Sequence, residues 1–204
     1  MDASYRDSQF VKYKSHEIEI PRWYEGQKRF INEWMSDIPK SHKILDIACG
    51  DGVGLKYFKE LGYTDMVGIE YEKEKSLNAS KYGFPVYNFD MHDLHVELNG
   101  LHGCADDFFD VVYSSHTLEH SYNPVIVVSE FKRVLKPGGK LVIVVPYVDL
   151  GPDDAHCGKY IIGTNKEDGA VGVRAFFQEN GFKILNWKLD GFREPEIWLK
   201  LSKK

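Results

Sequence analysis

Hydrophobic residues in the middle of the chain form short β-branched runs that alternate with longer amphipathic stretches. The run Phe109–Tyr113 is nearly all apolar, as expected for a strand that is buried on both faces of a parallel sheet. The amphipathic stretches predict helices that connect such strands, so the alternation indicates βαβ units. The pattern predicts strands over residues 43–47, 66–69, 85–89, 109–113 and 141–145.

Apolar periodicity and capping residues predict the helices. A helix is expected to run from the glycine turn after the first strand to about Leu61, where Gly62 can cap it. Asn123 and Pro124 suit the start of another helix, which residues 136–139, Lys-Pro-Gly-Gly, would end as a turn. The other predicted helices cover residues 21–36, 73–82 and 171–180, the last ended by Gly181.

The last two apolar runs, residues 183–189 and 197–201, suggest an antiparallel hairpin at the sheet edge. The pattern therefore predicts a single doubly wound, Rossmann-like α/β domain. Its seven-stranded sheet would be mainly parallel with an antiparallel C-terminal hairpin, and helices would cover both faces. Residues 41–204 are expected to form this domain, preceded by an N-terminal helical lid or substrate segment over residues 1–40. Trp23 and Tyr24 would either close over the ligand or pack the first helix onto the sheet.

The 204 residues carry a formal net charge of −5, which argues against nucleic acid as the main partner and favours a small molecule. No apolar run of about 18 residues exists to span a membrane. The N-terminus is polar and lacks the apolar core of a signal peptide. Three cysteines, Cys49, Cys104 and Cys157, lack paired spacing, which fits a reducing compartment. We therefore expect a cytoplasmic protein; the oligomeric state stays open.

The strongest local signal is a strand that runs into a glycine-rich turn at residues 43–52, Lys-Ile-Leu-Asp-Ile-Ala-Cys-Gly-Asp-Gly. A dinucleotide fold requires G-x-G-x-x-G, and here Leu55 occupies the position of the third glycine. Asp46 precedes the turn, where its carboxylate would repel a pyrophosphate and attract an ammonium or sulfonium group. S-adenosylmethionine carries both of these groups. The turn therefore favours this cofactor over a phosphate-bearing one.

The chain resembles the class I S-adenosylmethionine-dependent methyltransferases, in particular the small-molecule group called type 11. The family motif D-x-G/A-x-G-x-G is matched by Asp46, Ala48, Gly50 and Gly52, and the acidic residue after the second strand by Glu70. Residues 109–120 resemble the family's F-D-x-V-x-S-x-x-x-L-E-H, and residues 130–141 its next block. The likeness extends over about residues 43–146 and, more loosely, the C-terminal hairpin.

The resemblance implies a role for each matched residue in binding S-adenosylmethionine. Glu70 would accept hydrogen bonds from both ribose hydroxyls, and Tyr71 would lie against the adenine. Asp90 would accept from the adenine amino group, although Asp93 could play the same part, and Met91 would offer its backbone N–H. The simpler interpretations are that Asp46 caps the following helix and that Glu70 is a solvated carboxylate.

Further candidates lie after the fourth and fifth strands, at the sheet end where α/β proteins bind ligands. Ser114 is assigned to cofactor binding, and His116 to contact with cofactor or acceptor. The segment His116–His120 also matches the H-x-x-E-H pattern of one zinc peptidase group, but that site needs a continuous helix, which Pro124 disfavours. Asp153 and His156 are candidate catalytic residues in an acidic cluster that could act as a general base or bind a divalent ion; no metal is assigned. The cluster comprises Asp149, Asp153, Asp154 and His156.

The predicted reaction is direct displacement at the sulfonium methyl group by a nucleophilic atom of a small acceptor. Alignment of the reactants and exclusion of water can supply most of the catalysis, so no fixed nucleophile needs to appear in the sequence. The alternatives are a non-catalytic module that binds S-adenosylmethionine and a nicotinamide-dependent dehydrogenase. The sequence does not identify the acceptor.

Overall fold

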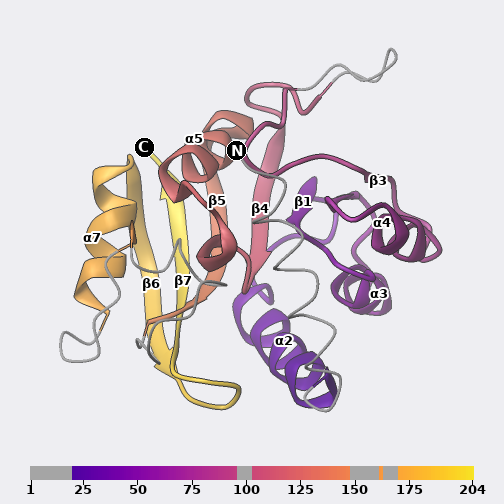
Figure 1. The fold of residues 1–204 in the computed structure, drawn as a ribbon, viewed down its shortest axis with the longest axis horizontal. Coiled ribbons are helices and arrows are strands. Elements are labelled where there is room, and N and C mark those ends of the chain that lie inside the picture. The colour runs from indigo at the N-terminus through magenta and orange to yellow at the C-terminus, as the bar shows by residue number, and fades with distance from the viewer. Residues whose placement is uncertain (1–19, 96–102, 148–160, 163–169) are drawn as a thin grey trace.

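The computed structural model describes residues 20–95, 103–147, 161–162 and 170–204 (Figure 1). Seven strands form one sheet in the order β3-β2-β1-β4-β5-β7-β6. The strands β1 to β5 pair in parallel, whereas β7 is antiparallel to both β5 and β6. The predicted fold class is therefore confirmed. The strands are β1 (Ile44–Ile47), β2 (Met66–Ile69), β3 (Val86–Tyr87), β4 (Phe109–Ser115), β5 (Leu135–Pro146), β6 (Phe182–Asp190) and β7 (Glu196–Lys203).

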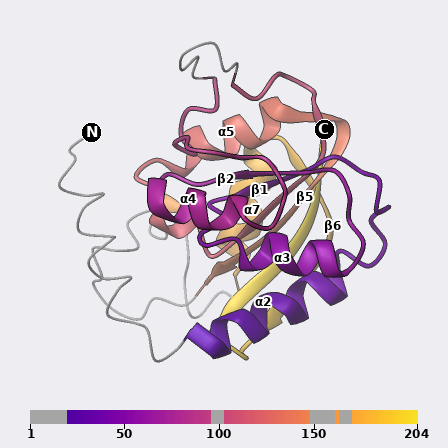
Figure 2. The same ribbon diagram turned by 90° about the vertical axis from the view of Figure 1, so that its right-hand side faces the viewer.

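Helices cover both faces of the sheet (Figure 2), and they bury the alternate side chains of its central strands. On one face, α5 and α7 pack over a cluster that includes Val112 and Ile143. On the other, α2, α3 and α4 pack over a cluster that includes Val111 and Val142. Successive strand residues thus serve opposite faces, and both are apolar, which explains the continuous apolar runs. The helices are α2 (Ile20–Trp34), α3 (Val53–Glu60), α4 (Lys73–Ser80), α5 (Pro124–Val134) and α7 (Val171–Glu179).

The capping residues act as the sequence predicts. Asn123 accepts a hydrogen bond from the backbone N–H of Ile126 at 3.4 Å, and Pro124 occupies the first turn of α5. Gly62 follows the end of α3 with φ +85°, a left-handed conformation that glycine adopts without strain. None of the helices in the described part of the chain is long and apolar enough to cross a membrane.

The prediction that residues 136–139 form a turn which ends the helix is wrong. These residues belong to β5, which begins at Leu135 directly after α5. Leu135 pairs with Phe109, but the next pair along β4 joins Val111 to Lys140, so the residues between form a bulge within the strand. Gly138 adopts φ +75° inside this bulge. The proline and glycines therefore interrupt the strand pairing without ending it, because the bulge absorbs the residues that cannot join the ladder.

Candidate active site

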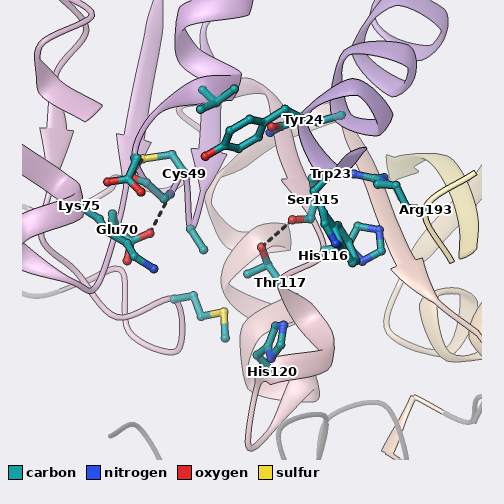
Figure 3. A pocket seen from close by; sticks show the side chains of 16 residues that line it. Trp23, Tyr24, Cys49, Glu70, Lys75, Ser115, His116, Thr117, His120 and Arg193 are labelled. Atoms are coloured by element: carbon teal, nitrogen blue, oxygen red, sulfur yellow. Dashed lines mark hydrogen bonds between the residues drawn. The ribbon is translucent and has the colours of Figure 1, made fainter. Parts of the chain in front are cut away.

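A pocket of about 250 Å³ opens at the carboxyl ends of the parallel strands (Figure 3). Trp23 and Tyr24 of α2 line it, together with the glycine turn after β1 and Glu70 after β2. The segment after β4 and Arg193, from the loop between β6 and β7, complete the wall. Figure 3 shows Glu70 and Cys49 on one side of the pocket, and His116, Trp23 and Arg193 on the other. The pocket therefore has two chemically different ends.

The glycine turn after β1 presents bare backbone to the pocket. Ala48 and Gly50 line it with φ values of +53° and +57°, a left-handed region that favours glycine and admits alanine at a cost. A Cβ added at Gly50 would meet no atom within 4 Å, so there is room for a ligand beside this residue. A Cβ at Gly52 would lie 2.6 Å from Ala79 Cα, so this glycine lets α4 pack closely.

Glu70 is fixed at the edge of the pocket. One carboxylate oxygen accepts a hydrogen bond from the Gly50 backbone N–H and the other from the Glu72 N–H, both at 2.9 Å. The side chain is buried, and burial raises its pKa even though these two hydrogen bonds favour the charged form. Each oxygen keeps a further lone pair, so the carboxylate can still accept hydrogen bonds from two adjacent hydroxyl groups.

Asp46 is buried at the end of β1, with 2% of its surface exposed. Within the described residues, nothing donates a hydrogen bond to its Oδ2. Burial and the negative charge of Glu70 raise the pKa of this carboxyl well above its usual range. A buried carboxyl oxygen without a partner is costly, and a cationic ligand group would offset that cost. Asp46 therefore fits a ligand that carries an ammonium or sulfonium group.

This burial predicts that Asp46→Asn stabilises the ligand-free protein. The elevated pKa means that the carboxyl opposes folding once pH rises above its unfolded value, near 3.9, because the native state resists ionisation. We expect the melting temperature of ligand-free Asp46→Asn to exceed that of the parent at pH 8. The same variant should bind S-adenosylhomocysteine at least tenfold more weakly. The exposed residue Asp51 provides the control Asp51→Asn for the stability measurement. A lower melting temperature for Asp46→Asn would contradict the interpretation.

Of the other predicted cofactor residues, Tyr71, Asp90 and Ser114 lie outside the wall of the pocket. Met91 lines it, whereas Tyr71 is 48% exposed beside Glu70 and is not in the wall. Asp90 accepts a hydrogen bond from the His92 N–H at 3.0 Å, and His92 Nδ1 lies 2.7 Å from the same oxygen. Ser114 is fully buried, and it is the next residue, Ser115, that lines the pocket. Successive residues of β4 point to opposite faces, so only one of these serines can reach the ligand directly.

His116 anchors a buried ionic cluster. Its Nε2 lies 2.7 Å from Glu196 Oε2, and its Nδ1 lies 3.3 Å from Glu119 and 3.2 Å from Glu194, close enough for ion pairing but without hydrogen-bond geometry. Burial and the positive charge of Arg193 oppose protonation, but the three carboxylates outweigh them and raise the pKa of His116 to about 10. The ring is therefore an imidazolium ion at neutral pH and a poor general base.

Two of the three carboxylate partners of His116, Glu194 and Glu196, come from a segment in which the sequence pattern marks no site. Glu196 is fully buried, and it also accepts hydrogen bonds from Arg193 at 3.0 and 3.2 Å and from the indole N–H of Trp198. The ring of Trp23 meets that of His116 edge-on at 4.6 Å. One signal was available: Arg193, Glu194 and Glu196 are charged residues directly before an apolar strand, where ionic groups need partners.

The zinc peptidase geometry does not form. Residues Leu118–His120 make a single 3-10 turn, so His116 and His120 do not share a helix face. The predicted catalytic residues Asp153 and His156 lie outside the described residues, as do Asp149 and Asp154. Their role stays a prediction.

The strand order, with an antiparallel β7 between β5 and β6, and the acidic residues at the ends of β1 and β2 define the class I S-adenosylmethionine-dependent methyltransferases. Residues 45–143 match the family model described as "Methyltransferase domain". The matched segment, residues 45–143, is slightly less than half of the chain, and it is similar to the methyltransferase domain of this family, whose methyl donor is S-adenosylmethionine. The unpartnered oxygen of Asp46, the open space beside Gly50 and the carboxylate of Glu70 all fit that cofactor.

Proteins of similar sequence or structure include methyltransferases and also an enzyme named for another reaction. Phosphoethanolamine N-methyltransferase 3 of Arabidopsis thaliana is 32% identical over 122 residues, which cover 58% of this chain and 24% of the plant protein. An S-adenosylmethionine-dependent methyltransferase from Mesorhizobium loti has a similar structure, with a TM-score of 0.61 and 16% identity over 83% of this chain and 95% of its own. The cyclase SpnF superposes with a TM-score of 0.67 and 15% identity, covering 88% of this chain and 80% of its own. The fold therefore serves more than one reaction.

Proposed function

We propose that the whole protein is an enzyme that transfers the methyl group of S-adenosylmethionine to a nucleophilic atom of a small molecule. The observation that carries the proposal is a buried carboxyl, Asp46, whose Oδ2 receives no hydrogen bond from the described residues and which feels the charge of Glu70. Glu70 and the glycine turn after Asp46 line one end of a pocket that continues past β4. This arrangement supports binding of a nucleoside with a cationic amino acid tail. The relative that acts on phosphoethanolamine supports a small, polar acceptor.

The chain would act mainly by holding and orienting its ligands. S-adenosylmethionine supplies an electrophilic methyl group on sulfur. Glu70 would hold the ribose, Asp46 the ammonium or sulfonium end, and Met91 the adenine edge through its backbone N–H. Trp23 and Tyr24 would exclude water from the reacting atoms, which favours displacement in a dry site. Because His116 is held as a cation, a general base would come from elsewhere, and Asp153 and His156 remain the predicted candidates.

Two other functions would give different results in binding and methyl-transfer assays. A non-catalytic module would bind S-adenosylhomocysteine but transfer no methyl group. A nicotinamide-dependent dehydrogenase would bind a dinucleotide, which the buried carboxyl of Asp46 disfavours because a pyrophosphate would meet a negative or unpartnered acceptor. We further propose that substrate specificity resides in residues 1–40, in the stretch of about residues 147–167 and in the loop after β4. Within residues 1–40, α2 supplies Trp23 and Tyr24 to the pocket.

The test is to incubate the protein with a methyl donor labelled on the methyl group and a metabolite library, and to detect labelled products by mass spectrometry. We expect at least one product, and we expect its formation to fall at least a hundredfold in Glu70→Ala when the donor is below saturation. In parallel, calorimetry measures the binding of S-adenosylhomocysteine and of a nicotinamide dinucleotide. Cofactor binding without any product would favour the binding module, and dinucleotide binding would favour the dehydrogenase.

The same proposal includes the cellular location and the partners of the protein. The free thiols of Cys49 and Cys104 support a reducing compartment, and we propose the cytoplasm. The net charge of −5 supports a small-molecule substrate without nucleic acid or membrane as a partner. Fractionation of cells that produce the tagged protein would check the location.

A further inference from the structure

The pocket end away from Glu70 presents cationic groups and hydroxyls to a ligand. Its wall contains Arg193, His116, Ser115 and Thr117, which Figure 3 shows on the side opposite Glu70. The pocket-lining carboxylates, Asp51 and Glu70, belong to the glycine turn and the end of β2 at the other end. The glutamates that balance His116 and Arg193 are not part of the wall. A ligand at this end therefore touches cations before it approaches any carboxylate.

Arg193 has hydrogen-bonding capacity left for such a ligand. Its Nε and Nη2 donate to Glu196, which holds the guanidinium in place. Its Nη1 lies 3.5 Å from Ser115 Oγ, a long contact for a hydrogen bond. The side chain is 2% exposed, and Glu196 behind it is fully buried. Nη1 is thus a fixed, weakly used donor in the pocket wall.

The charges at contact distance select the class of ligand group. An ammonium group here would meet the guanidinium of Arg193 and the imidazolium of His116, and both would repel it. A carboxylate or phosphate would accept hydrogen bonds from Nη1 and from the Ser115 hydroxyl. Charge-assisted hydrogen bonds of this kind are among the stronger polar contacts, and the fork of arginine suits planar and tetrahedral oxyanions. The arrangement thus fits an oxyanion better than an amine.

We propose that Arg193, together with Ser115, binds an anionic group, a carboxylate or a phosphate, of the methyl acceptor. The inference rests on the proposed methyl transfer and names the chemical class of its substrate. It assigns the anion to the acceptor because the ribose site at Glu70 follows β2, whereas Arg193 precedes β7. The donor Nη1 lies beside Ser115 at the end of β4, which β1 separates from β2, and Figure 3 shows Arg193 on the side of the pocket opposite Glu70. The methionine carboxylate of the cofactor extends only a short chain from the ribose.

The first test uses the full chain saturated with S-adenosylhomocysteine, so that the cofactor end is filled. Sodium phosphate, sodium acetate and tetramethylammonium chloride are titrated at constant ionic strength, and the melting temperature is recorded. We expect phosphate or acetate to raise it, and the anion that acts identifies the acceptor group. Tetramethylammonium should have no effect. Stabilisation by tetramethylammonium alone, or by none of the three, would overturn the proposal. If S-adenosylhomocysteine does not bind, the proposed function fails as well.

The second test separates Arg193 from the cofactor site. Arg193→Lys keeps the charge beside Glu196 but loses the fork, so the effective anion should bind at least tenfold more weakly, with S-adenosylhomocysteine affinity within about twofold of the parent. Lys56→Gln, on the exposed side of α3, changes one charge outside the pocket and should alter neither affinity. Equal losses for anion and cofactor would assign Arg193 to the cofactor and overturn the proposal. If Arg193→Lys fails to fold, Ser115→Ala replaces it, with an expected loss of about threefold in anion affinity.

Discussion

Replacing Glu70 with alanine is expected to weaken S-adenosylhomocysteine binding by at least a hundredfold. A carboxylate that accepts hydrogen bonds from two ribose hydroxyls contributes about 1.5–3 kcal/mol through each of them, and about 3 kcal/mol corresponds to that loss. Glu70→Gln, which keeps the size and one acceptor oxygen, should show an intermediate loss. Isothermal titration calorimetry at constant pH measures both. Glu74→Ala is the matched control, because it removes an exposed carboxylate from the first turn of α4.

A structural role of Glu70 must be separated from ribose binding, because its carboxylate also accepts the N–H groups of Gly50 and Glu72. A double-mutant cycle with the 2′-deoxy analogue of S-adenosylhomocysteine makes this separation. The parent should prefer the ribose form over the deoxy form, and Glu70→Ala should lose most of that preference. If the variant kept the full preference, Glu70 would brace the turn without touching the ribose. Unchanged affinity for S-adenosylhomocysteine would show that the cofactor assignment of Glu70 is wrong.

The sheet and most of its helices could be predicted because their signals are local. The apolar run of β4, the caps of α5 and the glycine after α3 each act within a few residues, and the structure shows elements at those places. The bulge at residues 136–139 was mistaken for a turn, since proline and glycine interrupt a helix and a strand in the same way. The third strand is shorter than predicted, Val86–Tyr87, because it pairs only with β2 at the sheet edge.

The cofactor end of the site could also be predicted from the sequence, whereas the ionic cluster around His116 could not. Asp46 lies one residue before the end of β1, and Glu70 follows β2 directly, so strand order alone places them at one edge of the sheet. The contact between His116 and Glu196 joins residues 80 positions apart. It forms only because β7 inserts antiparallel between β5 and β6, and no local pattern specifies that register. The sequence could mark Glu196 as an unusual charge before an apolar strand but could not name its partners.

Glu196→Gln is expected to lower the free energy of unfolding by about 3–5 kcal/mol, because it removes the buried carboxylate that pairs with both His116 and Arg193. Denaturant unfolding at pH 7 measures the loss. The exposed pair of Lys188 and Glu33 provides the control Glu33→Gln, for which at most about 1 kcal/mol is expected. A loss as small as that of the control would mean that the cluster contributes little to the fold.

The same cluster should make the stability of the protein fall as the pH rises. His116 has its pKa raised to about 10 in the folded state, against about 6.5 when unfolded, so the folded state holds the proton more tightly. Its contribution is fully present below pH 6.5 and is lost as the pH rises through about 10, an effect of a few kcal/mol in free energy of unfolding. His116→Gln should flatten this part of the pH profile relative to the parent, since lysine, tyrosine and cysteine titration is common to both proteins. Parallel profiles for parent and variant would show that His116 is not held as a buried cation. Arg193 would then have no cationic neighbour in His116.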